Sequence, residues 1–237
     1  MSEQSSARLG LPYLQPAQAQ KHVTVNEALA RLDGLVNPVL ASISRASPPA
    51  AAQDGTAFGV PSGASGPWAG RAGHIAIASN GGWVFAAPRA GMRAFIEDEG
   101  AGAIHDGEAW AVGAATLSPS GSALCFRAIE AELELSAGAQ MAADLTIPHA
   151  AMVFGVTARV SAPITGSLSA WSLGTEGALN RFGQGLGLGA GSWARGMLSQ
   201  PVTYWAPSPL LLTAEGGSFA GGRVRLCAHI AELRLPS

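Results

Sequence analysis

The chain has 237 residues, of which 13% are charged, and its formal net charge is −2. This balance argues against a nucleic-acid-binding protein, which normally carries a basic surface. No apolar run approaches the ~20 residues of a membrane-spanning helix, so we expect no membrane insertion. Residues 1–8 are polar and contain no apolar core, so we also expect no Sec export.

The first predicted element is a helix over residues 25–36. Thr24-Val-Asn-Glu27 has the form of a capping box, and Pro38 cannot continue a helix. Four apolar residues recur at helical spacing and form one stripe: Val25, Leu29, Leu32 and Val36. A helix this short is marginal alone. We therefore expect the stripe to pack on the β body of the chain or on the same helix in sister subunits, where it would serve oligomerisation and attachment.

Two β-hairpins are predicted next, over residues 74–85 and 102–112. They turn at Asn-Gly and Asp-Gly, which supply the positive φ that two-residue hairpin turns require. Each hairpin returns on a tryptophan, Trp83 or Trp110. A module this small has few other large side chains to bury, so we expect both in its core, with Trp68 filling a neighbouring gap. The alternative is a platform for stacking a sugar ring.

Residues 114–237 predict an antiparallel β-sandwich of jelly-roll type, because short alternating strands are separated by turn clusters. In residues 222–230, one face would carry Val224, Leu226, Ala228 and Ile230, and the other Arg223, Arg225, Cys227 and His229. The Gly-rich stretch 179–191 lacks the Gly-Lys-Ser/Thr ending of a phosphate-binding loop. We interpret it as strand and loop that another backbone or subunit approaches closely.

Aromatic and polar residues that suit a carbohydrate site gather in this second half. An aromatic ring can stack on the C–H face of a sugar, and neighbouring polar groups can bind its hydroxyls. The candidates are Trp193, Tyr204, Trp205, Asn180, Arg181 and Arg195. Core packing is the alternative for each aromatic residue. The two cysteines are interpreted as buried thiols, and with the scattered histidines they show no ligand spacing, so we expect no metal or cofactor.

The predicted architecture is therefore mainly β. It comprises a helical attachment segment (1–48), a Trp-containing β-hairpin module (49–113) and a C-terminal antiparallel β-sandwich that binds a receptor (114–237).

The opening Leu11-Pro-Tyr-Leu-Gln-Pro-Ala-Gln-Ala-Gln-Lys-His-Val-Thr-Val-Asn-Glu-Ala-Leu29 resembles an uncharacterised domain family found in phage-like tail-fibre proteins. The hairpins resemble the rest of that domain, and Asn180-Arg-Phe-Gly183 and Gly221-Gly-Arg-Val-Arg-Leu226 resemble a module common at fibre tips. The resemblance implies a fibre or head-spike subunit of a phage-like particle, such as a gene transfer agent. Such a subunit would be made in the cytoplasm, released by lysis, homotrimeric and in contact with other particle proteins, and would bind host-surface polysaccharide.

Two other functions stay open at this point. The chain could be a purely structural adaptor between particle proteins. It could instead be a capsule depolymerase, which needs two carboxylates on opposite sides of a groove. Its candidates would be Glu130, Glu132, Glu134, Asp144 and Glu176. Because the family resemblance brings no catalytic motif, we do not expect an enzyme.

Overall fold

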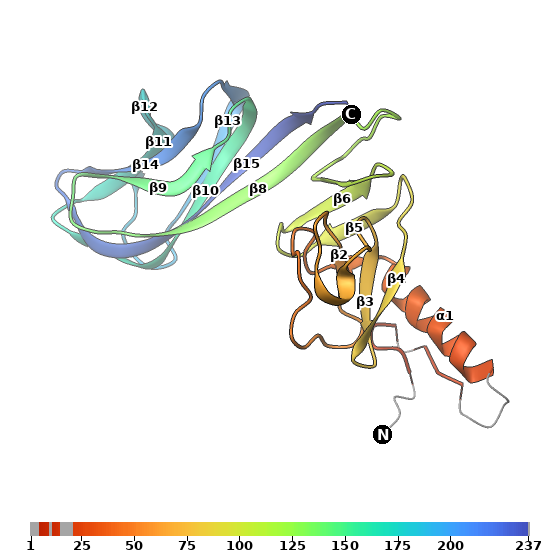
Figure 1. The fold of residues 1–237 in the computed structure, drawn as a ribbon. Coiled ribbons are helices and arrows are strands. Elements are labelled where there is room, and N and C mark those ends of the chain that lie inside the picture. The colour runs from red at the N-terminus through yellow and green to blue at the C-terminus, as the bar shows by residue number, and fades with distance from the viewer. Residues whose placement is uncertain (1–4, 10, 15–20, 237) are drawn as a thin grey trace. The chain divides into compact units, whose positions relative to one another are not determined.

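Figure 1 shows the computed structural model, which describes residues 5–9, 11–14 and 21–236, and of residues 21–24 the backbone alone. The predicted fold class, mainly β, is confirmed, since one short α-helix precedes a body of largely antiparallel sheets. The chain forms two compact units: residues 1–123 with 235–237, and residues 124–234. Within the described residues, no helix is long and apolar enough to cross a membrane.

A seven-stranded sheet organises the first unit. In spatial order its strands are β4 (Gly82–Ala86), β3 (Ile75–Ser79), β2 (Ala57–Gly59), β1 (Val39–Leu40), β5 (Arg93–Ile96), β6 (Ala101–His105) and β7 (Trp110–Val112). The central strand β1 runs parallel to both β2 and β5. All other pairs are antiparallel, so a three-stranded meander lies on each side of β1. The two predicted hairpins, β3–β4 and β6–β7, therefore occupy opposite edges of one sheet.

The turns of the two hairpins differ. Asn80 and Gly81 form a two-residue loop between Ser79 and Gly82, with φ of 51° and 72°, as the Asn-Gly pair predicts. The second loop is longer, because its strands close at the pair His105–Trp110. Asp106 Oδ1 accepts the N–H groups of residues 108 and 109 at 2.8 and 2.7 Å. The side chain of Asp106 thus organises a four-residue loop, and the expected two-residue turn is wrong there.

Helix α1 (Lys21–Leu35) begins four residues earlier than predicted. Thr24 therefore lies inside the helix and does not cap it, so the capping-box interpretation is wrong. The C-terminal end agrees with the sequence. Val36 N–H still donates to a helical carbonyl, and Asn37 then takes a φ of 47° directly before Pro38.

The face of α1 that packs on the sheet is not its apolar stripe. Gly34 meets Ile77 so closely that a Cβ at Gly34 would lie 2.3 Å from Ile77 Cδ1. On the stripe, Val25, Leu32 and Val36 are 38%, 48% and 43% exposed, and Leu29 is half-buried. Of the two partners considered for the stripe, the chain's own β body leaves most of it uncovered.

Polar anchors tie an N-terminal arm to the buried face of α1. Asp33 is 2% exposed and accepts hydrogen bonds from Ser6 Oγ at 2.8 Å, from Arg8 N–H at 2.9 Å and from the next backbone N–H. Two helical turns before Asp33, Asn26 exchanges two hydrogen bonds with the backbone of Leu14 at 2.8 and 3.1 Å. These partners explain why polar residues stand on a buried helix face.

The tryptophans of the first unit are buried in a different order from the one predicted. Trp68, at the end of the 3₁₀ turn η1 (Gly66–Trp68), is fully buried, whereas Trp83 and Trp110 are half-buried. The ring of Trp68 lies 5.0 Å from that of Trp83 and 5.3 Å from that of Phe58, both centroid to centroid. Trp110 packs edge-on against His105 at 4.9 Å. Trp68 is therefore the centre of this aromatic cluster.

The second unit is an eight-stranded sandwich of two four-stranded sheets. One sheet has the order β13 (Trp193–Tyr204), β10 (Ala151–Gly166), β15 (Phe219–Arg234) and β8 (Ala123–Glu134). The other has the order β12 (Ala178–Leu186), β11 (Ala170–Thr175), β14 (Ser208–Glu215) and β9 (Gln140–Ile147). Counted along the sandwich, these orders are 6-3-8-1 and 5-4-7-2, the connectivity of a jelly roll.

Alternating apolar residues fill the space between the two sheets. On β15, Val224, Leu226, Ala228 and Ile230 are buried, and Arg223, Arg225, Cys227 and His229 point to the outer side, as predicted. Trp171 on β11 is 1% exposed, and its indole N–H donates to Gly187 O at 3.0 Å. The core thus satisfies its largest polar side chain, as buried aromatic residues generally require.

Candidate functional site

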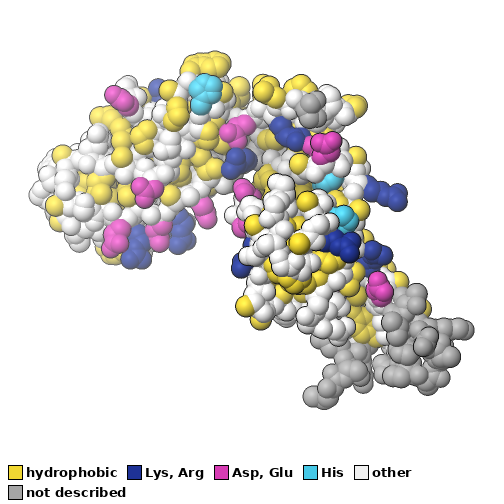
Figure 2. All heavy atoms as spheres, in the orientation of Figure 1, with side chains coloured by type: hydrophobic (Ala, Val, Ile, Leu, Met, Phe, Trp, Pro, Cys, Tyr) yellow, Lys and Arg dark blue, Asp and Glu magenta, His cyan; other side chains and the backbone are white. Residues whose placement is uncertain are grey.

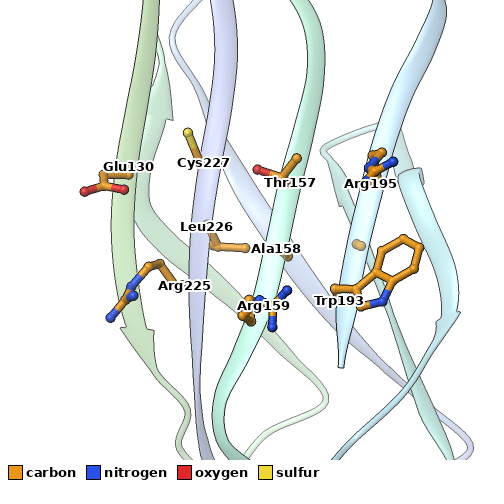
Figure 3. A pocket seen from close by; sticks show the side chains of 10 residues that line it. Glu130, Thr157, Ala158, Arg159, Trp193, Arg195, Arg225, Leu226 and Cys227 are labelled. Atoms are coloured by element: carbon orange, nitrogen blue, oxygen red, sulfur yellow. The ribbon is translucent and has the colours of Figure 1, made fainter. Parts of the chain in front are cut away.

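A groove of about 550 Å³ crosses the outer face of the sheet β13-β10-β15-β8 (Figure 3). All four strands contribute to this outer-face groove. Its lining side chains include Glu130 from β8, Arg225 and Cys227 from β15, Thr157 and Arg159 from β10, and Trp193 and Arg195 from β13.

Strand register brings the groove residues together. Arg159 is paired with Trp193 on one side and with Arg225 on the other. Two residues along, Thr157 is paired with Arg195 and with the cysteine of β15. Because side chains alternate across a strand, both rows lie on the same outer face. Residues far apart in the chain therefore form one continuous surface.

Trp193 is the exposed aromatic residue of the groove. It is 61% exposed, and the guanidinium carbon of Arg195 lies 5.6 Å from the centre of its ring. This distance is within the range of a cation–π contact. A planar ring held at the edge of a groove by a neighbouring cation offers its free face to a ligand.

The charges of the groove are predominantly positive. Arg225 forms an ion pair with Glu132 at 3.3 Å, and Glu132 also accepts a hydrogen bond from Ser161 at 2.9 Å. Arg159 and Arg195 have no acidic partner within the described parts of the chain. Figure 2 shows how sparse charged side chains are on the visible surface. Against that background, three guanidinium groups around one groove are a marked local concentration.

The outer-face groove continues into a second hollow of about 260 Å³. The two share Thr157 and Arg195, and the second adds Phe154, Met197 and His229. Thr157 Oγ1 and His229 Nε2 lie 3.2 Å apart, so they form a hydrogen bond on the floor. The combined lining comes from all four strands of the sheet, so it offers an extended ligand more contacts than a compact one could use.

Cys227 is a half-buried thiol on the groove floor, which corrects the expectation that both cysteines are buried. Burial in the first place, and the nearby Glu130 in the second, raise the pKa of Cys227. Cys125 on the neighbouring strand is buried, and burial raises its pKa as well. Thiols with raised pKa values are mostly protonated near neutral pH and are weak nucleophiles. The groove is therefore better suited to binding than to thiol chemistry.

The structure brings together only some of the predicted carbohydrate-binding residues. Trp193 and Arg195 both line the groove. Trp205 is 76% exposed but follows the end of β13 and is not among the lining residues. Tyr204 is half-buried against the sandwich core, and its hydroxyl lies 3.2 Å from Oγ1 of the buried Thr175.

The polar pair Asn180 and Arg181 belongs to β12, in the opposite sheet. Asn180 donates a hydrogen bond to Gln184 at 2.8 Å on its own strand. Neither residue lines the outer-face groove, so the structure does not support placing them in one site with Trp193.

The prediction missed Arg159, Arg225 and Thr157 as site residues. The alternation of β15 had already placed Arg225 on an outer face, and Val156, Ala158 and Val160 are buried around Arg159 in the same manner. The sequence alone does not show that β10 pairs with β13 and β15, because this pairing depends on the order of the strands in the sheet.

The carboxylates do not flank the groove as a hydrolytic pair would. Glu130, Glu132 and Glu134 alternate along β8, and Glu130 alone lines the groove. Asp144 and Glu176 lie on and beside strands of the other sheet. In the described residues, no cluster of three His, Cys, Asp or Glu side chains could hold a metal ion.

The first unit has a hollow of its own, of about 480 Å³. Its lining includes His74, His105, Glu108 and Trp110. His105 is 2% exposed, and its Nδ1 accepts the Gly107 N–H at 3.1 Å. Burial lowers the pKa of His105, and the neighbouring Asp106 carboxylate partly opposes this effect. The buried imidazole therefore stays neutral around pH 7 and supports the β6–β7 loop.

Comparison with known proteins assigns part of the chain. No curated protein matches it. Residues 25–111 match a family described as a protein of unknown function, DUF2793. This stretch begins within α1 and ends within β7, so it covers most of the helix and of the seven-stranded sheet. The first unit of this chain accordingly contains a DUF2793 domain.

Proposed function

We propose that this chain is an adhesive fibre or spike subunit of a phage-like particle, such as a gene transfer agent, and that its sandwich binds host cell-surface polysaccharide. The observation that carries this proposal is the outer-face groove with Trp193 at its edge, 61% exposed. A free indole face beside hydrogen-bonding side chains is suited to a sugar ring. The resemblance of the N-terminal half to tail-fibre domains supports the particle context.

The arrangement of carboxylates favours binding over hydrolysis. Glycosidases use two carboxyl groups about 5–10 Å apart across the scissile bond, whereas Glu130 is the single carboxylate lining this groove in the described residues. Sugar contacts of this open kind are individually weak, and several copies in one particle would gain avidity through their effective concentration.

The test compares two exposed tryptophans of the same unit. Trp193→Ala should abolish binding of the purified protein to encapsulated cells, whereas Trp205→Ala should retain it. Both side chains are already largely exposed, at 61% and 76%, so neither change should alter the melting temperature by more than about 2 °C. Wild-type protein should not bind capsule-less cells. Equal cell binding by Trp193→Ala and wild type would contradict the proposal.

A structural adaptor remains the second candidate, because an apolar patch adjoins the groove on the same sheet face and shares Phe154 with the second hollow. Phe126 on β8 and Phe154 on β10 are 46% and 38% exposed with ring centroids 6.0 Å apart, and Leu124 and Met152 are also exposed. Such a patch is typical of protein contacts. If the chain is an adaptor, Phe126→Ser with Phe154→Ser should remove it from isolated particles, and Trp193→Ala should leave every interaction intact.

A further inference from the structure

We infer that the outer-face groove binds an acidic polysaccharide, and that Arg159, Arg195 and Arg225 recognise the carboxylates of its uronic acid residues. This inference rests on the proposed function and adds the chemical class of the ligand. Without a ligand, the positive charges of these arginines repel one another.

Arg159 and Arg225 face each other directly across two antiparallel strands. Side chains at such positions have Cβ atoms about 4.5–5.5 Å apart, and like charges there are destabilising. Glu132 compensates Arg225 through its 3.3 Å ion pair. Arg159 has no such partner within the described residues, and neither does Arg195. A bound anion would relieve this repulsion and provide the missing partner.

The presence of arginine rather than lysine indicates which kind of anion the groove binds. The planar guanidinium fork matches a carboxylate in a bidentate geometry. Thr157 adds a hydroxyl between the arginines on the groove floor. The adjacent Trp193 ring supplies a surface for the apolar face of a sugar. One ring with its carboxylate could therefore use both kinds of contact at once.

The shape of the surface favours a polymer. The second hollow extends the groove past Arg195 toward Met197 and His229. A simple anion would occupy one arginine and leave the rest of this surface empty. A nucleic acid would also be extended and anionic, but proteins that bind it normally carry a broad basic surface, whereas this chain has a formal net charge of −2. The acidic polysaccharide is thus the ligand that uses the whole groove.

The experiment measures binding of the full chain to alginate, polygalacturonate and hyaluronan, each alongside its carboxyl-reduced form. At least one native polymer should bind, and its neutral form should bind at least tenfold more weakly. Because the contacts are exposed, raising the salt to 1 M, where the Debye length falls to about 3 Å, should also weaken binding. Arg159→Gln and Arg195→Gln should each weaken it about tenfold. Arg223→Gln is the matched control, since Arg223 is an exposed residue of the same sheet face outside the groove lining.

The outcomes separate this inference from the proposed function. Equal affinity for native and carboxyl-reduced polymers would overturn the acidic-ligand inference and leave polysaccharide binding in place. The same holds if no polymer binds while encapsulated cells still do. Tighter binding of single-stranded DNA than of every polymer would overturn it in favour of a nucleic acid. If neither cells nor polymers bind, both proposals fail.

The half-buried thiol of Cys227 gives an independent readout on the unmodified protein. Cys227 lies on the groove floor, whereas Cys125 is buried on the neighbouring strand. A bound polymer should slow maleimide labelling of Cys227 and leave labelling of Cys125 unchanged. Unchanged labelling of Cys227 under saturating polymer would place the ligand elsewhere and overturn the assignment of this groove.

Discussion

His105 links the stability of the first unit to pH. Its Nδ1 accepts the Gly107 N–H at 3.1 Å, so a proton added to Nδ1 would replace an acceptor with a donor. Its pKa lies below 6.5 in the folded chain, whereas the unfolded chain titrates near that value. The unfolded state therefore binds more protons below pH 6.5, and stability must fall as the pH drops through that range.

The expected result is faster amide exchange in β6 and β7 at pH 5.5 than at pH 7.5, after correction for intrinsic exchange rates. His105→Gln should lower protection at both values but remove most of the difference between them. His149→Gln is the control, because His149 is exposed and belongs to the second unit, so it should leave the difference unchanged. An identical pH dependence in His105→Gln and wild type would contradict this assignment.

Residue type alone does not predict which tryptophans are buried and which are exposed. Trp171 and Trp193 both belong to strands of the sandwich, yet the first is 1% exposed and the second 61%. The difference depends on which strand face meets the opposite sheet. Trp193, a candidate because aromatic and polar residues gather near it in sequence, lines the outer-face groove. Tyr204 is a candidate for the same reason, but its side chain is half-buried against the core and its hydroxyl forms a hydrogen bond with Thr175.

At the scale of elements, local patterns were reliable where one interaction decides the structure. The Asn-Gly turn and the alternation of β15 both depend on neighbouring residues. The start of α1 was not predictable in this way. A capping box at Thr24 is a local signal, but the helix continues upstream to Lys21, and its packed face is set by Gly34 and by polar anchors to an arm distant in sequence.

The glycine-rich stretch 179–191 illustrates the same limit. Gly185 and Gly191 adopt positive φ angles of 62° and 84°, with open space where a Cβ would lie. Their role is conformational and does not reflect the close approach of another backbone. Another backbone does approach the stretch closely at Phe182, but the glycine that allows this approach is Gly196, outside the stretch, where a Cβ would lie 2.2 Å from the carbonyl oxygen of Phe182. The strands β12 and β13, from different sheets, meet there.

Gly196→Ala should therefore destabilise the sandwich by about 1–3 kcal/mol, because the colliding atoms belong to the backbone and cannot rotate away. Urea unfolding followed by tryptophan fluorescence would measure the change. Gly189→Ala provides the control: its φ is not in the left-handed region, and its nearest neighbour would be 3.8 Å from the new Cβ. A loss no greater than that of the control would show that β12 and β13 can separate without cost.

On the scale of the whole molecule, the order of the strands within each sheet could not be predicted from the sequence. Arg159 and Arg225 form one row only because β10 lies between β13 and β15 in a jelly-roll sheet. The fold class followed from strand number and spacing, whereas the groove needed the pairing of distant segments. In the first unit, the two-residue strand β1 is central to the sheet, and nothing in so short a segment signals that position.

The uncovered stripe of α1 bears on how many chains assemble. Val25, Leu32 and Val36 are 38–48% exposed in the single chain, and a short helix with an apolar stripe is suited to a parallel bundle. We expect light scattering at micromolar concentration to give a homotrimer. Leu32→Glu with Val36→Glu should convert it to a monomer, since the charges would be buried between helices without partners.

Because these side chains do not support the fold of a single chain, the monomeric variant should keep its far-ultraviolet circular dichroism spectrum and its affinity for short glycan fragments. Its binding to cells should fall by at least tenfold, since the loss of two neighbouring sites removes their effective concentration. Glu27→Lys, an exposed change on the other side of α1, should leave the trimer intact. A monomeric wild-type protein, or a trimeric double variant, would show that the stripe of α1 is not the contact that holds the trimer together. The stripe could then not account for avidity.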